Sequence, residues 1–206
     1  LKILARNNWK NYAVIGDVTV SMYPYTAQLL LWIRQHGLDN TSNDYCFFND
    51  GDDTPNSEKK IGSTGGVYAQ HCETYEEVKA LLKETMAKGD GGDLPENDVE
   101  ALIDAEKKFP QHDFQVLIAD NRAPVKDIVL LNKLTKPVRI VLCGANDYNI
   151  NADYLTIARK TKGSVHLIEK DISDLSSFSE GETMKIGKKI YKIQNDHFTE
   201  VESNDK

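Results

Sequence analysis

Three oxygen-bearing side chains follow the first apolar run of the chain. Asp17, Thr19 and Ser21 come directly after residues 12–16, with one residue between each of them. A carboxylate and two hydroxyls on one short loop offer the hard oxygen ligands that a small divalent cation prefers. The loop therefore predicts a metal site. Taken singly, the same residues also fit a helix-entry cap and a turn aspartate that binds backbone amides.

Two further acidic positions could join this loop. Asp120 ends the apolar run 114–119, and Asp93 lies in the glycine-rich acidic loop 89–97, directly before a helical segment. In an open parallel sheet, ligands bind beyond the carboxyl ends of the strands, where the loops of neighbouring strands converge. We therefore expect carboxylates from separate loops to meet over one edge of the sheet.

The elements that position these loops alternate between strands and helices. Apolar runs rich in Val, Ile and Phe occur at residues 12–15, 45–48, 114–119, 138–143 and 164–168. The pattern predicts an α/β fold, a three-layer, Rossmann-like, doubly wound and mainly parallel sheet of about six strands. Residues 66–69 are expected as one antiparallel edge strand. The period-two pattern after residue 183 predicts a C-terminal β-hairpin.

Helix signals occur between these runs. A helix is expected from Pro24 to near Gly37, with apolar residues around almost its whole circumference. Thr74 and Glu77 form a capping box that opens another helix, which ends at Gly89. Pro95, Pro124 and Asn151 are expected to open three more.

Length and composition bound the class of protein. The 206 residues are enough for one large domain, which we place at residues 10–170, with residues 171–206 as an extension packed on it or following it. The formal charge is −7, and Lys and Arg are spread along the chain, which argues against a nucleic-acid surface. No apolar run is long enough to span a bilayer. The three cysteines are expected to be unpaired. Because the chain begins at Leu1, a signal peptide or further domain could precede it.

The ordered set of loops resembles the von Willebrand factor type A domain, over approximately residues 10 to 170. The family's metal-ion-dependent adhesion site has a first loop of the form Asp-x-Ser-x-Ser, and residues 17–21 are similar, with Thr19 keeping the hydroxyl. The third loop of the family supplies an aspartate after an apolar strand, which corresponds to Asp120. Asn121 stands where glycine is usual.

The second loop departs from the common pattern. Many family members have a threonine there, whereas residues 91–96 read Gly-Gly-Asp-Leu-Pro-Glu and look like a variant of bacterial type A domains. The resemblance makes Asp93 the candidate for the missing ligand, either direct or through water.

The resemblance implies a protein-binding module that is not an enzyme. Its site would hold Mg²⁺, with Mn²⁺ or Ca²⁺ as possible substitutes, and would capture an acidic residue of a partner protein. It also favours an extracytoplasmic location, although the localisation is not fixed by the sequence. No His, Cys or Lys lies in residues 17–21, 91–96 or 120–121 to act as a nucleophile or proton shuttle, so no catalytic constellation is identified there.

Three alternatives remain open at this point. The loops could be a metal-free relic of an adhesion site. Residues 17–21 also resemble the phosphorylated loop of haloacid dehalogenase-like phosphotransferases, with Asp17 as the nucleophile. Residues 49–66 are longer than an ordinary connection, and Asp50, Asp52 and Asp53 within them could form a second cation site or a solvated loop.

Overall fold

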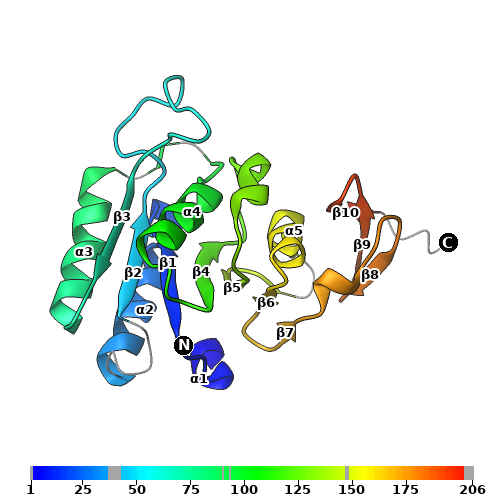
Figure 1. The fold of residues 1–206 in the computed structure, drawn as a ribbon, viewed down its shortest axis with the longest axis horizontal. Coiled ribbons are helices and arrows are strands. Elements are labelled where there is room, and N and C mark those ends of the chain that lie inside the picture. Colours follow the sequence, from blue (N-terminus) through cyan, green and yellow to red (C-terminus); the bar gives the residue numbers. More distant parts are fainter. Residues whose placement is uncertain (1, 37–42, 90, 93, 147–148, 202–206) are drawn as a thin grey trace.

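The main sheet has the predicted α/β architecture and carries seven strands. The computed structural model describes residues 2–36, 43–89, 91, 92, 94–146 and 149–201. The strand order is β3-β2-β1-β4-β5-β6-β7 (Figure 1). The bounds are β1 Tyr12–Asp17, β2 Asp44–Phe48, β3 Val67–His71, β4 Phe114–Asp120, β5 Val138–Cys143, β6 Ser164–His166 and β7 Asp171–Ile172.

Both edges of this sheet are antiparallel, whereas one such edge was predicted. The strands β2, β1, β4, β5 and β6 run parallel to one another, and β3 pairs antiparallel with β2 as expected. The second antiparallel edge is β7, which pairs with β6 through two residues. A two-residue strand has no recognisable period in the sequence, so no pattern indicated it.

Helices cover both faces of the sheet. One apolar cluster joins the sheet to α1 (Lys2–Asn7), α2 (Tyr23–His36) and α3 (Tyr75–Lys88). The other joins it to α4 (Asp98–Lys108) and α5 (Ala152–Lys160). Short 3₁₀ segments occur at η1 (Val20–Met22), η2 (Ile128–Lys133) and η3 (Leu175–Ser177). This is the three-layer arrangement that the alternating pattern predicted.

The central strand β1 is buried on both faces, which explains why its last residue is buried too. Its six residues are all buried, and successive side chains enter opposite clusters. Tyr12 and Val14 face the cluster of α2 and α3, whereas Ala13 and Ile15 face the cluster of α4 and α5. A strand covered on both faces carries Asp17 at its end into the interior of the molecule.

Two helix predictions are corrected by the structure. The helix expected from Pro24 is α2, but its apolar residues bury one face, because Leu31 on the other side is 46% exposed. The helix expected from Pro124 is instead the 3₁₀ segment η2. The capping box at Thr74 is present: its hydroxyl accepts from Glu77 N, and the Glu77 carboxylate accepts from Thr74 N.

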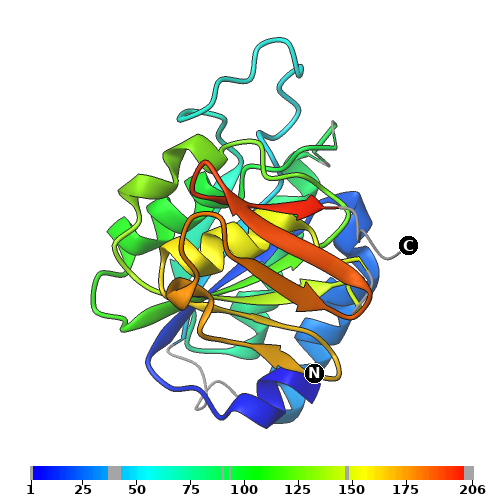
Figure 2. The ribbon, with the colours of Figure 1, turned by 90° about the vertical axis from the view of Figure 1, so that its right-hand side faces the viewer.

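The C-terminal residues form a small sheet rather than a single hairpin. Strands β8 (Thr183–Ile186), β9 (Lys189–Gln194) and β10 (His197–Val201) pair in the order β10-β9-β8. The sheet lies across α5, as Figure 2 shows, and Phe198 N donates to Thr156 Oγ1 at 2.9 Å. The division at residue 170 stays a prediction. The strand β7, which begins directly after it, pairs with the main sheet.

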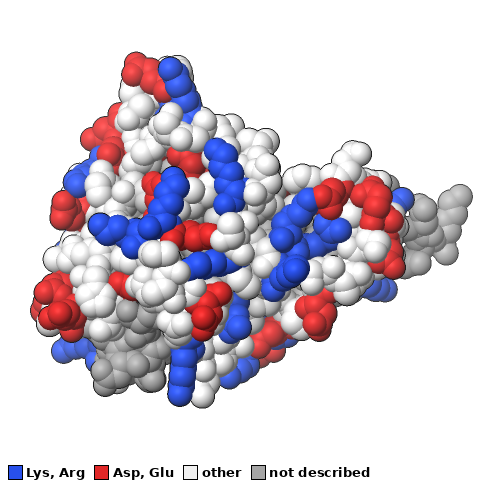
Figure 3. Space-filling model, viewed as in Figure 1, with Lys and Arg blue, Asp and Glu red and all other residues white. Residues whose placement is uncertain are grey.

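The remaining bulk expectations concern cysteines, charge and membranes. Cys46, Cys72 and Cys143 are free. Acidic and basic side chains are interspersed on the face shown in Figure 3. Within the described part of the chain, no helix has both the length and the apolar character needed to cross a membrane.

The turn from α5 into β6 gives a stability prediction. A Cβ on Gly163 would lie 1.8 Å from the Val138 carbonyl oxygen, whereas one on Gly181 would meet nothing within 4 Å, although Gly181 has φ +85°. We expect Gly163→Ala to cost several kcal/mol because backbone must move, and Gly181→Ala to cost about 1–3 kcal/mol from backbone strain alone. Urea unfolding measures both, and equal losses would contradict the packing argument.

Candidate functional site

The first predicted loop gathers its three oxygen-bearing side chains. Asp17 ends β1, and η1 begins three residues later and brings Ser21 back beside Thr19. Asp17 Oδ1 accepts from Thr19 N at 2.8 Å and from Thr19 Oγ1 at 2.7 Å. The hydroxyl oxygens of Thr19 and Ser21 are 3.4 Å apart. The loop therefore presents two hydroxyls and one carboxylate together.

The second carboxylate oxygen of Asp17 is left without a partner. Asp17 is 1% exposed, and no hydrogen-bond partner of its Oδ2 is present in the described structure. Burial raises the pKa of Asp17 to about 7, although two hydrogen bonds from Thr19 lower it. The charges of Asp120 and Asp50 raise it further. A buried, unpaired carboxylate oxygen is costly unless a proton or a cation satisfies it.

The third predicted loop lies beside the first. Asp120 ends β4, which neighbours β1 in the sheet, and its side chain is buried. Asp120 Oδ1 accepts from Arg122 N at 3.0 Å. The Asp120 carbonyl oxygen accepts from the Tyr154 hydroxyl at 3.1 Å, which fixes the strand end on α5. Asp17 and Asp120 are therefore neighbours at the carboxyl edge, as predicted.

The second predicted loop approaches the first through glycine. Gly91 has φ +101°, and a Cβ there would lie 3.0 Å from Thr19 Cγ2. A larger residue would push the loop away from Thr19. Asp93 itself lies outside the described residues, so its assignment as a ligand stays a prediction.

Glu96 and Asp98 are acidic residues of this site that the sequence reasoning did not select. Glu96 is 4% exposed and Asp98 is 0% exposed, and Glu96 Oε2 and Asp98 Oδ2 have no hydrogen-bond partner in the described structure. Burial raises the pKa of Glu96 to about 10, with the charges of Asp17, Asp50 and Asp98 acting in the same direction. Burial also raises the pKa of Asp98, and the charge of Asp17 adds to it. The signal was the run of acids around Pro95, directly before α4.

Glu96 also ties two of the loops together. Its backbone N–H donates to the Pro124 carbonyl at 3.0 Å, and its carbonyl accepts from Lys126 N at 2.8 Å. These bonds form an isolated parallel bridge between Glu96 and Val125. Backbone hydrogen bonds therefore join the loop before α4 to the loop after β4.

Residues 49–66 are anchored, and their aspartates have separate structural roles. This segment stands above the sheet in Figures 1 and 2. Asp50 is 0% exposed and its Oδ2 accepts from Lys59 at 2.8 Å and from Lys126 at 2.6 Å. Asp52 Oδ1 accepts from Asn49 Nδ2 at 2.9 Å, and both its oxygens accept from the Tyr68 hydroxyl. Asp53 is exposed. The three aspartates do not share a cation site.

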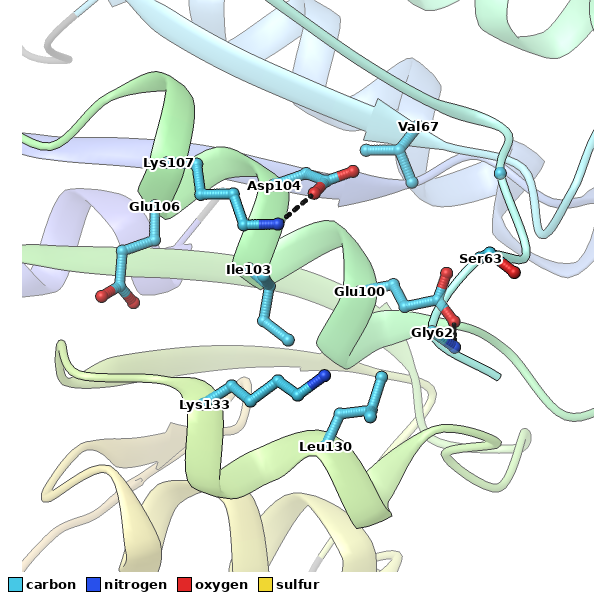
Figure 4. A pocket seen from close by; sticks show the side chains of 11 residues that line it. Gly62, Ser63, Val67, Glu100, Ile103, Asp104, Glu106, Lys107, Leu130 and Lys133 are labelled. Atoms are coloured by element: carbon cyan, nitrogen blue, oxygen red, sulfur yellow. Dashed lines mark hydrogen bonds and ion pairs between the residues drawn. The ribbon is translucent and has the colours of Figure 1, made fainter. Parts of the chain in front are cut away.

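A groove of about 460 Å³ lies beside this segment, against α4 and η2 (Figure 4). Glu100 holds its rim, because its carboxylate accepts from Thr64 N at 2.8 Å and from Thr64 Oγ1 at 3.0 Å. Ile103 and Leu130 line the groove, and Lys107 donates to Asp104 at 3.4 Å. Asp17, Thr19, Ser21 and Asp120 do not line this groove. It is separate from the loops around Asp17.

The donor set at the carboxyl edge suits a small hard cation. In the described residues, no group of three or more His, Cys, Asp or Glu side chains is arranged to hold a metal ion. Of the predicted ligands that the structure describes, Asp17 and Asp120 contribute carboxylates, and Thr19 and Ser21 contribute hydroxyls. The unpartnered Asp17 Oδ2 beside those hydroxyls is the observation that fits a divalent ion.

Comparison with solved structures finds similar folds, whereas comparison with sequences does not. No protein-family model matches the sequence, and no curated protein matches it. Among solved structures, the chain is similar to a von Willebrand factor type A protein from Catenulispora acidiphila, at 15% sequence identity and a TM-score of 0.39. The similarity covers 81% of this chain and 39% of that structure.

The raised pKa of Asp17 predicts how stability depends on pH in the presence of chelator. The folded state keeps the Asp17 proton up to about pH 7, whereas the unfolded chain releases it near pH 4, so stability falls as the pH rises between these values. The loss is at most about 1.4 kcal/mol per pH unit from this group. Asp17→Asn should reduce the difference in unfolding free energy between pH 5 and pH 7.

The matched control is Asp53→Asn, which removes one negative charge from an exposed site. It should leave the pH dependence as in the wild type. Urea unfolding at both pH values decides the matter, and an unchanged pH dependence in Asp17→Asn would refute the assignment of a buried proton to this carboxyl.

Proposed function

We propose that this chain is a metal-ion-dependent protein-binding module. Asp17, Thr19 and Ser21 would hold a Mg²⁺-type ion together with Asp120 and Asp93, at the carboxyl edge of the sheet. The proposal is supported above all by Asp17 Oδ2, which is buried and unpartnered in the described structure next to two clustered hydroxyls. The motif resemblance to von Willebrand factor type A domains supports it independently.

The residues have distinct roles in this proposal. Thr19 fixes the Asp17 carboxylate, because its backbone N–H and its hydroxyl both donate to Oδ1. The other oxygen, Oδ2, stays without a partner in the described structure and would bind the ion. Asp120 adds negative charge, and Arg122 N holds its Oδ1. When bound, a divalent ion supplies a Lewis-acidic coordination position that a carboxylate from a partner can fill. Because two of the donors are neutral hydroxyls, the bound ion would keep positive charge that attracts that carboxylate.

The buried carboxylate of Asp50 is neutralised by lysines of the chain itself, whereas that of Asp17 is not. Lys59 and Lys126 contact Asp50 at 2.8 and 2.6 Å, so this buried acid is compensated by the chain itself. Asp17 has no such lysine contact in the described structure, and its environment is enriched in acids. A cation is therefore drawn to Asp17 rather than to Asp50.

Metal binding should stabilise the folded protein. At roughly 100-fold excess over Kd, Mg²⁺ or Mn²⁺ should raise the melting temperature of the wild type by about 5–10 °C, because the ion binds only the folded state. Asp17→Ala and Asp120→Ala should lose this shift. Asp53→Ala, which removes an exposed acid from a neighbouring segment, should keep it. If no divalent ion raises the melting temperature of the wild type, the proposal is wrong.

Capture of a carboxylate is measured separately. In Mn²⁺-loaded protein, a short peptide with one central aspartate should lower the water-proton relaxation rate, since its carboxylate displaces a water molecule from the ion. The peptide with asparagine at that position should have little effect. If both peptides act equally, or neither does while Mn²⁺ is bound, the site binds metal without the proposed recognition.

The phosphotransferase alternative has less support from the fold. Residues 79–88 belong to the helix α3, so the acidic loop after them does not follow a strand. Asp127, the next acid after Asp120, accepts from Val99 N and Glu100 N and so fixes the start of α4. Hydrolysis of an aryl phosphate that is abolished in Asp17→Asn would favour this alternative over the binding module.

A further inference from the structure

A line of three hydrogen-bonded side chains lies at the opposite end of the sheet. Ser164 Oγ is 2.7 Å from His166 Nε2, and His166 Nδ1 is 2.7 Å from Asp171 Oδ1. Ser164 and His166 are two residues apart on β6 and so share a face. Asp171 is the direct partner of His166 across the β6–β7 pair. The strand geometry therefore aligns a hydroxyl, an imidazole and a carboxylate.

The protonation states of His166 and Asp171 decide which atom donates in each hydrogen bond. Burial acts to raise the pKa of Asp171, but hydrogen bonds from Arg6 and His166 outweigh it and leave the pKa lowered. Burial lowers the pKa of His166. A neutral imidazole beside an ionised carboxylate donates from Nδ1, which leaves Nε2 to accept the Ser164 proton. This is the order of donors in a Ser-His-Asp triad.

Both of the supporting groups are held in place. Arg6 contacts both carboxylate oxygens of Asp171, and it also donates to the carbonyls of Leu167 and Ile168 at 2.9 Å each. The Trp9 ring packs edge-on against the His166 ring, with 4.7 Å between the ring centroids. These contacts hold the Asp171 carboxylate and the His166 imidazole beside each other.

Ser164 opens onto a cleft that contains a cation. The cleft has a volume of about 500 Å³ and is lined by Ser164, His166, Trp9, Pro137 and Arg139, among others. Arg139 is the cross-strand partner of Ser164, and its guanidinium lies over the Phe114 ring at 3.7 Å. In the described structure no protein oxygen accepts a hydrogen bond from Arg139. Its donors are available to an oxyanion in the cleft.

We propose that Ser164 is the nucleophile of a second site, which hydrolyses small carboxylic esters by acyl transfer. His166 is the general base and acid, Asp171 is a positioning residue that acts through His166, and Arg139 stabilises the oxyanion. The limited volume of the cleft and its apolar wall of Trp9 and Pro137 fit a small acyl group rather than an extended peptide.

The two half-reactions balance without a further reagent. Ser164 Oγ bonds to the ester carbonyl carbon while its proton passes to His166 Nε2. The carbon–oxygen bond to the alcohol then breaks, and the alcohol leaves with the proton from His166. In the second half, water gives a proton to His166 and bonds to the acyl carbon, and the Ser164–acyl bond breaks as Ser164 takes the proton back.

The test uses a fluorophosphonate probe and 4-nitrophenyl acetate on the whole chain. The wild type should carry one phosphonyl adduct, located on Ser164 by peptide mass spectrometry, and should hydrolyse the ester. Ser164→Ala should lose the adduct and at least about 100-fold of the rate. Ser173→Ala and Ser176→Ala, which change other serines lining the cleft, should retain both.

A pH profile distinguishes catalysis from a merely structural network. The rate should rise as His166 loses its proton, with an inflection at a lower pH than for an ordinary histidine. Burial and the charges of Arg139 and Arg6 lower the pKa of His166 more than Asp171 raises it. His166→Gln should remove this inflection while circular dichroism still reports a folded chain. Asp171→Asn should lower the rate, since the imidazole loses its fixed tautomer.

Several outcomes would overturn the proposal. They are a folded wild type without an adduct on Ser164, a Ser164→Ala variant with the wild-type rate, and an adduct on Ser173 or Ser176 instead. If Ser164→Ala does not fold, the position of the wild-type adduct alone decides the question. Labelling should be the same in excess Mg²⁺ and in chelator, so this test is independent of the metal site.

Discussion

The burial of one carboxylate at the end of the central strand governs the carboxyl edge of this protein. Helices cover both faces of β1, so Asp17 enters the interior with one oxygen bound to Thr19 and the other unpartnered in the described structure. An unsatisfied charge in such a place is unfavourable. The surrounding loops bring more acids to it, and no lysine contacts it in the described part of the chain. A proton or a cation at this edge would satisfy that oxygen.

Asp50, a neighbouring buried acid, is compensated by lysines of the chain. Asp50 is also buried at the end of a strand, but Lys59 and Lys126 both contact its Oδ2. One lysine comes from the long segment after β2 and the other from the loop after β4, so the ion pairs join two separate parts of the chain. Two carboxylates at one edge thus differ in role because of the cations that the chain does or does not supply to them.

The sequence was sufficient for the fold class and for the adjacency of two candidate residues. Strand ends, the capping box at Thr74 and the adjacency of Asp17 and Asp120 follow from periodicity and from the rules of parallel sheets. Glu96 and Asp98 were missed because their burial depends on α4 and on the bridge to Val125, which no local pattern encodes. The 3₁₀ segment η2 was missed because Pro124 signals a helix start equally well for either kind of helix. Ser164 and His166 were missed because their partner, Asp171, belongs to a strand of two residues.

The backbone bridge between Glu96 and Val125 has a mechanical consequence. Two hydrogen bonds fasten the loop before α4 to the loop after β4, and Asp127 fastens the start of α4 to the same segment. These segments form one clamp, so a displacement of either is a displacement of both. Force applied to one loop would be shared by α4 and by the end of β4, rather than concentrated on a single turn.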